Sequence, residues 1–239
     1  MDYMFPLIDR TTVAEGTMSF DFDITGQDYP YRAGQHADYT LIDPPHTDDE
    51  GNVRTFSFVS SPNNRDSITI ATRMRNTAFK NSLNEIPIGT KVKVSEPMGQ
   101  FTLQKDASVP AVFIAGGIGI TPFMSLITYA SEEKLPHSMT LFYSNRTQAA
   151  AAFLPELEAW KTQNRNFTLV PTLTDESPPN WPDETGRIDM AMIEKYVPAY
   201  RTAIFFVAGP PAMVSAMAVL LDQNGIEETR IKAEDFAGY

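Results

Sequence analysis

The pattern of apolar residues changes near residue 106, and no other feature of the sequence constrains its fold as strongly. Before that point apolar and polar residues alternate, as in half-buried β-strands, and this holds over residues 18–24, 37–41, 68–74 and 92–94. Turn-forming residues separate these stretches, and one short helix is expected at about 78–85. Several short strands at this spacing predict an antiparallel β-barrel. We therefore predict a six-stranded antiparallel β-barrel domain over residues 1–106.

After residue 106, continuous apolar runs alternate with segments of helical character. Strands are expected at 109–115, 139–143, 167–173, 204–208 and 230–236, and helices from Pro122, at about 150–161, from the cap Asp189 to about Tyr196, and up to Gln223. A regular alternation of strands and helices is typical of a parallel sheet covered by helices on both faces. Residues 107–239 are therefore predicted to form a doubly wound α/β domain.

The composition excludes several classes of function. The 239 residues include 19 Lys and Arg against 30 Asp and Glu, a net charge of −11, and no cysteine. The lack of cysteine excludes disulfides, thiol nucleophiles and Cys-ligated zinc or iron–sulfur centres. The negative charge argues against a nucleic-acid partner. His36, His46 and His137 are scattered without metal-ligand spacing, so no metal site is expected.

Two uncharged stretches, 111–130 and 203–221, are long enough to span a membrane. Glycines and prolines interrupt both, so each is better explained as a buried strand, a tight turn and a helix. Without a signal peptide at the N-terminus, we expect a cytoplasmic chain with no membrane span. The acidic residues between Asp43 and Glu50 are interpreted as a solvated hairpin loop.

A glycine-rich turn follows the first strand of the predicted α/β domain, with the sequence Ala115-Gly116-Gly117-Ile118-Gly119-Ile120-Thr121-Pro122. Thr121 is expected to cap the next helix, and Pro122 suits its first position. Exposed N–H groups at a helix N-terminus bind anions such as a pyrophosphate. Alternatively, the glycines only let the helix pack closely on the strand, and this turn alone leaves both interpretations open.

Two other strand ends would lie at the same edge of the sheet. Ser144-Asn145-Arg146 follows the second strand, and Ala208-Gly209-Pro210-Pro211-Ala212-Met213 includes the end of a later one. Ligands of open α/β sheets bind outside the carboxyl ends of the strands. Three such segments on one edge favour a nucleotide site.

The predicted barrel contains a cationic segment. Between Arg54 and Lys80 there are five basic residues and one acidic residue, a local charge of +4 in an acidic chain. A guanidinium group matches the geometry of a phosphate. A solvated strand face with scattered arginines is the alternative, but the local density favours an anionic ligand.

Four segments together resemble the ferredoxin–NADP reductase family. Arg54-Thr55-Phe56-Ser57 resembles its Arg-x-Tyr-Ser flavin signature, and Gly116 to Pro122 resembles its nicotinamide-nucleotide loop. Ala208-Gly209-Pro210-Pro211 resembles its Cys-Gly-Pro-Pro segment, and Glu234 to Tyr239 resembles its C-terminal strand. The four motifs keep the order and spacing of the family and cover nearly the whole chain.

The resemblance implies that FAD binds to the barrel. Arg54 would pair with the FAD pyrophosphate, Phe56 would lie against the isoalloxazine, and Ser57 would hydrogen-bond near its N5. The implied FAD-binding residues are Arg54, Thr55, Phe56, Ser57, Ala71, Thr72, Arg73, Phe79, Lys80, Asn81 and Phe236. Lys80 stands near a position where the family has a hydroxyl, and its charge would replace that contact. Ser57, Glu234 and Phe236 are the implied catalytic residues, with Phe236 covering the other flavin face. Either Glu234 or Asp235 would take the role of the family's carboxylate near the flavin, or else the acid is an ordinary surface residue.

The resemblance also implies a site for NADPH or NADH in the α/β domain. Its residues would be Gly116, Gly117, Ile118, Gly119, Thr121, Pro122, Ser144, Asn145, Arg146, Ala208, Gly209, Pro210, Pro211 and Met213. Ala208 replaces the family's cysteine, which removes any thiol-assisted positioning of the nicotinamide. Arg146 would meet the 2′-phosphate of NADPH, or else it is an ordinary loop arginine.

The expected function is that of a flavoprotein reductase. It would transfer a hydride from NAD(P)H to FAD and then electrons to a separate acceptor, either a redox protein such as a ferredoxin or a small molecule. Two alternatives stay open: a flavin-binding electron-relay subunit of a larger complex, and a nucleotide-binding module without a redox role.

Overall fold

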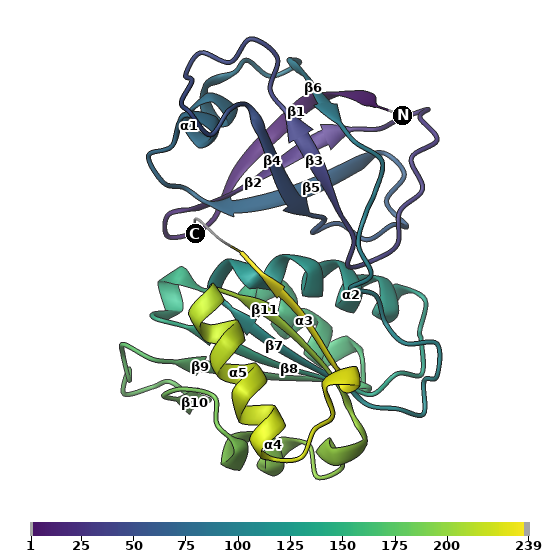
Figure 1. Cartoon of the computed structure of the whole chain (residues 1–239), viewed down its shortest axis with the longest axis vertical. Coiled ribbons are helices and arrows are strands. Elements are labelled where there is room, and N and C mark those ends of the chain that lie inside the picture. Colours follow the sequence, from purple (N-terminus) through teal and green to yellow (C-terminus); the bar gives the residue numbers. More distant parts are fainter. Residues whose placement is uncertain (1, 237–239) are drawn as a thin grey trace.

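A computed structural model describes residues 2–236, which form two six-stranded sheets. All strands of the first sheet pair antiparallel, in the order β4-β3-β6-β1-β2-β5. They are β1 (Tyr3–Ala14), β2 (Thr17–Asp23), β3 (His36–Thr40), β4 (Val53–Ser57), β5 (Ser67–Arg73) and β6 (Lys91–Val94). The edge strands β4 and β5 lie in contact, so the sheet curls into the predicted barrel (Figure 1).

Alternation along the strands fills the barrel core. Phe20 and Phe22 of β2 are fully buried, as are Ile68 and Ile70 of the neighbouring β5. Helix α1 (Ala78–Glu85) lies where the sequence predicts it, and the Thr77 side chain accepts a hydrogen bond from the backbone of Lys80.

Strand β1 has no counterpart in the sequence-based prediction, although it is the longest strand in the described part of the chain. Only Phe5 and Leu7 are fully buried in it, and Pro6 lies between them. Its second half carries charged, exposed residues and pairs with β2. The period-two signal is therefore too short to identify the strand.

The second sheet is parallel throughout, in the order β10-β9-β8-β7-β11-β12. Its strands are β7 (Ala111–Gly116), β8 (Met139–Asn145), β9 (Phe167–Leu173), β10 (Glu184–Thr185), β11 (Ile204–Gly209) and β12 (Ile231–Asp235). Helices α2 (Thr121–Glu132) and α3 (Leu154–Gln163) pack on one face, and α4 (Met190–Tyr196) and α5 (Pro211–Gln223) pack on the other (Figure 1). The predicted doubly wound fold is confirmed, and its strand order reverses between β7 and β11.

Some boundaries differ from the prediction. Residues 117–120 form a 3-10 turn that leads directly into α2, so Ile120 rather than Thr121 holds the N-cap position. The Thr121 hydroxyl instead donates to the Ile118 carbonyl at 3.2 Å, and the prediction that it caps the helix is wrong. Helix α3 begins at Leu154 instead of about Ala150, because Phe153 has a left-handed backbone with φ of +59°. The predicted cap Asp189 is confirmed, since its carboxylate accepts from the Met192 backbone at 2.8 Å.

The two uncharged stretches are strand–helix units, as predicted. The first consists of β7, the 3-10 turn and α2, and the second contains β11 and α5. No helix within residues 2–236 combines the length and hydropathy needed to cross a bilayer.

Polar contacts join the two domains. Ser125 on α2 donates to the Ser60 carbonyl at 2.6 Å, and Lys232 on β12 donates to the Thr102 carbonyl at 2.7 Å. The barrel consequently lies over the sheet edge at which the parallel strands end (Figure 1).

Candidate active site

Three cavities follow the boundary between the domains. One, of about 360 Å³, is lined by Arg73, Arg75, Gly116, Gly117, Ile118, Ser144, Asn145, Arg146, Thr174, Pro210 and Met213. Another, of about 460 Å³, is lined by His36, Arg54, Thr55, Ser57, Ala233, Glu234, Asp235 and Phe236. A small one between them is lined by Thr55, Phe56, Ser57, Ala71, Ile118, Thr121 and Phe236, so it shares residues with both. We call the first the phosphate-side cavity and the second the carboxylate-side cavity.

The glycines of the first turn have separate structural roles. A Cβ on Gly119 would lie 2.2 Å from the Ala208 carbonyl oxygen, so this glycine lets the turn pack against β11. Gly117 has a φ of +52° and open space around its Cα, and it lines the phosphate-side cavity. Both interpretations of the turn therefore hold: Gly119 allows close packing, and Gly117 lines the cavity.

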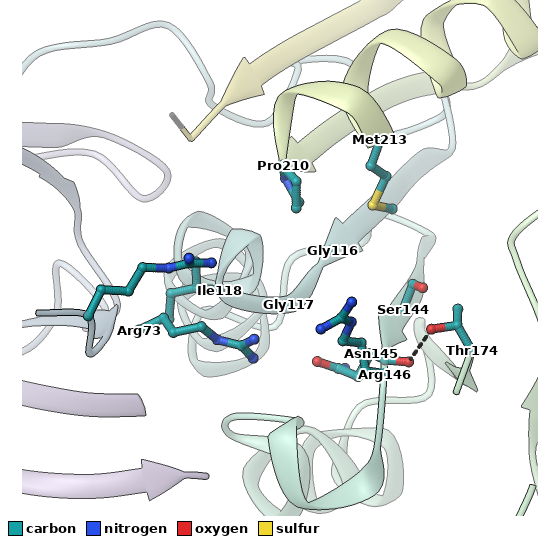
Figure 2. Close-up of a pocket in the computed structure, with 11 residues that line it drawn as sticks. Arg73, Gly116, Gly117, Ile118, Ser144, Asn145, Arg146, Thr174, Pro210 and Met213 are labelled. Carbon is teal, nitrogen blue, oxygen red and sulfur yellow. Dashed lines mark hydrogen bonds between the residues drawn. The ribbon is translucent and has the colours of Figure 1, made fainter. Parts of the chain in front are cut away.

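Arginines from both domains line the phosphate-side cavity. Figure 2 shows Arg73 extending from the barrel side toward Gly117, with Arg146 and Asn145 across the cavity. Among the described residues, the side chains of Arg73 and Arg75 have no hydrogen-bond or ion-pair partner, whereas Arg146 lies 3.3 Å from an Asp175 carboxylate oxygen. Unpaired guanidinium groups in an acidic chain favour an anionic ligand.

Asn145 gives this cavity a further polar group. The residue is 5% exposed, and its Oδ1 is buried without a hydrogen-bond partner within residues 2–236. The hydroxyl of the nearby Tyr143 donates instead to the Ala152 carbonyl at 3.1 Å. Buried polar atoms are nearly always paired in folded proteins. Asn145 therefore adds a buried amide to the cavity wall beside the glycine turn.

The carboxylate-side cavity contains a buried acid beside a histidine. Glu234 Oε1 lies 3.8 Å from His36 Nδ1, and Glu234 Oε2 has no partner among the described residues. Burial raises the pKa of Glu234 to about 7. Burial also lowers the pKa of His36, although the charge of Asp38 opposes the shift. Glu234 is thus poised to gain or lose a proton near neutral pH.

Ser57 and Phe236 connect this cavity to the glycine turns. Ser57 is 5% exposed, at the end of β4. The Phe236 backbone donates to the Gly209 carbonyl at 3.0 Å, which fixes Phe236 beside the second glycine turn. The structure therefore brings the predicted residues of the barrel and of the sheet edge into one cleft.

Other predicted flavin residues lie deeper in the barrel. Phe56 packs against Phe79 with ring centroids 5.8 Å apart, and both rings are buried. Lys80 is also buried, and its ammonium donates to the Arg73 carbonyl at 3.0 Å. Burial, together with the charges of Arg75 and Arg54, lowers the pKa of Lys80 to about 8. Asn81 donates to the side chain of Asn76.

Arg54 has specific partners within its own domain. Its guanidinium donates to the Glu50 carboxylate at 2.6 Å and lies 3.9 Å from the Asp48 carboxylate. The acidic residues lie in the exposed hairpin loop between β3 and β4, as predicted, and the Glu50 side chain is 71% exposed. The loop also pairs with Arg54, which the sequence did not indicate. His36, Arg75 and Thr174 line the cavities but are not among the predicted site residues, because none of them lies in a recognisable motif.

The cleft suits a flavin and a nicotinamide nucleotide lying side by side. Thr55, Ser57 and Phe236 line its centre, and the glycine turn and the unpaired arginines lie at one end. A two-domain protein with this fold and cleft belongs to the class of flavoprotein oxidoreductases.

Comparison with known proteins identifies the family. The model of the oxidoreductase FAD-binding domain matches residues 4–103, and that of the oxidoreductase NAD-binding domain matches residues 113–218. The chain belongs to the FAD- and NAD-binding oxidoreductases of the ferredoxin–NADP reductase type, as the sequence motifs predict.

Curated relatives are longer than this chain. It is 26% identical to a subunit of the Na(+)-translocating NADH-quinone reductase of Serratia proteamaculans over 253 residues, which cover 89% of this chain and 62% of that protein. It is 28% identical to the anthranilate 1,2-dioxygenase electron transfer component of Acinetobacter baylyi over 200 residues, which cover 83% and 57%. The chain thus spans less than two thirds of the length of these two relatives.

Solved structures support the fold. The cytochrome b5 reductase domain of Ulva prolifera nitrate reductase superposes with a TM-score of 0.82 at 21% identity, covering 99% of this chain and 97% of that one. A ferredoxin NADP+ reductase from Neisseria gonorrhoeae, solved with bound FAD and NADP, gives 0.79 at 17% identity and 98% coverage of both chains.

Proposed function

We propose that this chain is a flavoprotein reductase that takes a hydride from NADPH or NADH and passes electrons to a separate acceptor. The observation that carries the proposal is the single cleft that joins Ser57 and Phe236 to the glycine turns and the unpaired arginines. Bound FAD would supply the chemistry that links a two-electron donor to one- or two-electron acceptors.

The chain's own residues would orient the two ring systems. We assign Ser57 to a hydrogen bond near the flavin N5, and Phe236 to a stacking position that the nicotinamide must take for hydride transfer. Glu234 is assigned to proton exchange at this end of the cleft, since its carboxyl group is buried beside His36. Ala208 provides no thiol, so nicotinamide positioning depends on the backbone of the glycine turns and on Phe236.

We further propose different roles for the arginines of the phosphate-side cavity. Arg73 is an FAD residue by the family resemblance, but it and Arg75 line the cavity that contains the glycine turn. We therefore assign both to the pyrophosphate shared by NADPH and NADH. Arg146 directly follows β8, and in such sheets an arginine near this position binds the 2′-phosphate of NADPH. The barrel would then contribute directly to nicotinamide-nucleotide binding, and only Arg146 would distinguish the two nucleotides.

The acceptor is proposed to be a separate redox protein or a small molecule. The sequence has no cysteine to ligate an iron–sulfur cluster, and a relative is named as an electron transfer component of a dioxygenase. A second candidate is an electron-relay subunit, favoured by the likeness to one component of an NADH-quinone reductase.

We place the chain in the cytoplasm, where nicotinamide nucleotides are available, and divide it into domains between residues 106 and 107.

An anaerobic visible spectrum tests the proposal. The purified protein, supplied with FAD, should be yellow and should lose the visible absorbance of oxidised flavin when NADPH or NADH is added. An added one-electron acceptor should restore the colour with turnover. A protein that binds no flavin would refute the proposal, and flavin that stays oxidised with both nucleotides would refute the reductase function.

A further inference from the structure

The groups expected to bind the flavin phosphates are engaged by carboxylates of the chain itself. Helix α1 begins beside Arg54, whose guanidinium carbon lies 5.4 Å from the Phe79 ring centroid. A guanidinium group and the first N–H groups of a helix are the two kinds of group that bind phosphate most readily. Arg54 also lines the carboxylate-side cavity together with Ser57 and Phe236, so it belongs to the cleft.

Asp48 occupies the N-terminus of α1. Its Oδ2 accepts from the Ala78 backbone N–H at 3.1 Å, and its Oδ1 accepts from the Glu50 backbone N–H at 3.1 Å. The same Oδ1 lies 3.9 Å from Arg54 Nη2. One carboxylate thereby contacts both the helix N-terminus and the guanidinium group, as a phosphate between them would.

Glu50 completes the coordination of Arg54. Its Oε2 accepts from Arg54 Nη2 at 2.6 Å, and its carbonyl accepts from Arg54 Nη1 at 3.0 Å. The carbonyls of Gly51 and Val53 accept from the same nitrogen. The Arg54 side chain is 23% exposed and that of Glu50 is 71% exposed, so a phosphate that takes the place of the Glu50 carboxylate at Arg54 Nη2 would displace an exposed partner.

The acidic segment is attached to α1 at one end and ends in a glycine at the other. His46 is fixed to α1 by hydrogen bonds with both Ser82 Oγ and the Glu85 carboxylate. Gly51, at the other end, has a φ of +75° and open space around its Cα. Between the segment and Phe79 lies a cavity of about 260 Å³. The cavity leaves space beside Asp48 and Gly51 into which the carboxylates could be displaced.

We propose that Asp48 and Glu50 act as an internal substitute for the flavin phosphates and so set the affinity and the phosphate dependence of flavin binding. A flavin with phosphate groups must displace both carboxylates from Arg54 and from the α1 N-terminus. Riboflavin, which lacks phosphate, would bind without displacing either carboxylate. The inference rests on the proposed flavoprotein function.

The experiment measures flavin affinity in the apoprotein, by quenching of flavin fluorescence, with FAD, FMN and riboflavin. Asp48→Asn/Glu50→Gln keeps side-chain size and removes two charges. Asp43→Asn/Asp49→Asn is the matched control, because both residues are exposed in the same segment and no hydrogen bond or ion pair joins their side chains to another described residue. Exposed ion pairs contribute up to about 1 kcal/mol each, so the first variant should bind FAD and FMN about fivefold more tightly, and up to about thirtyfold more tightly if both pairs contribute fully.

The expected result is tighter binding of FAD and FMN by Asp48→Asn/Glu50→Gln, with riboflavin affinity and the control variant within about twofold of the unmodified protein. If the control variant binds FAD and FMN more tightly by the same factor, the proposal is overturned, because the change in net charge alone would then explain the effect. Unchanged or weaker FAD binding, or equal tightening for riboflavin, would also overturn it. If those outcomes accompany normal reduction of bound flavin by NADPH or NADH, the reductase function survives and only this inference fails.

Discussion

The pKa of Glu234 leads to a stability test that needs no ligand. Glu234→Gln replaces an ionisable side chain with a neutral one of nearly the same shape. The Glu234 side chain is 20% exposed, and its Oε2 has no partner within residues 2–236. Ionisation therefore places a charge in an environment that solvates it poorly.

The size of the effect follows from the pKa of about 7, against 4.5 for an ordinary glutamate. Because the folded state holds this proton more tightly than the unfolded state, the stabilisation is complete below pH 4.5 and is lost as pH rises through 7. Each pKa unit corresponds to about 1.4 kcal/mol. With allowance for partial exposure, the unmodified protein should lose about 2 to 3 kcal/mol of unfolding free energy from this group.

Urea unfolding of the apoprotein at several pH values, from about the ordinary glutamate pKa to about one unit above that of Glu234, measures the difference. Glu234→Gln should become more stable relative to the unmodified protein by about 2 to 3 kcal/mol across this range, because glutamine does not ionise. Glu228→Gln, at an exposed position whose side chain makes no hydrogen bond or ion pair with the described chain, should show no such trend. A difference between Glu234→Gln and the unmodified protein that stays constant with pH would refute the reasoning.

Three other predictions concern the cleft and the fold. Arg146→Ala should raise the KM for NADPH about tenfold or more and that for NADH less than about twofold, whereas Arg75→Ala should raise both KM values similarly. Steady-state kinetics with the two nucleotides measures these effects. An equal effect of Arg146→Ala on both KM values would show that Arg146 does not distinguish the nucleotides. Gly119→Ala should destabilise the fold by about 1 to 3 kcal/mol in chemical unfolding, because the new Cβ meets the Ala208 carbonyl; unchanged stability would contradict the close approach. Asp189→Ala should lower the unfolding free energy by about 1 kcal/mol through loss of the α4 cap, and no loss would show that the cap does not contribute.

The fold could be predicted because the two sheets bury their strands differently. Strands of the barrel are half buried and alternate in polarity, whereas β7 is buried on both faces and consists of one apolar run. Both glycine turns could be found for a related reason, since the strand ends that carry them have little room for side chains. Where these signals weaken, as in β1 with its exposed second half, the sequence does not identify the strand.

The carboxylate-side cavity could be predicted only in part. Ser57 and Glu234 lie in motifs, but His36 meets Glu234 only because β3 of the barrel faces the end of β12. The partner of Arg54 was hidden for a different reason. A run of acidic residues in a loop looks the same in sequence whether its carboxylates are solvated or bind a guanidinium group, and only the coordinates distinguish Asp48 from its neighbour Asp49.

The distribution of paired and unpaired arginines fits the different demands on two bound nucleotides. A reductase releases and rebinds its nicotinamide nucleotide in every cycle, while a bound flavin stays in place. Unpaired guanidinium groups produce a local positive potential that attracts a charged ligand and speeds its association. Arg73 and Arg75, which line the phosphate-side cavity, have no carboxylate partner in the described chain. Arg54, on the flavin side, is neutralised by Asp48 and Glu50. Under the proposed function, in a protein with a net charge of −11, this arrangement would keep the attraction for the site that must be refilled and limit it where a ligand is retained.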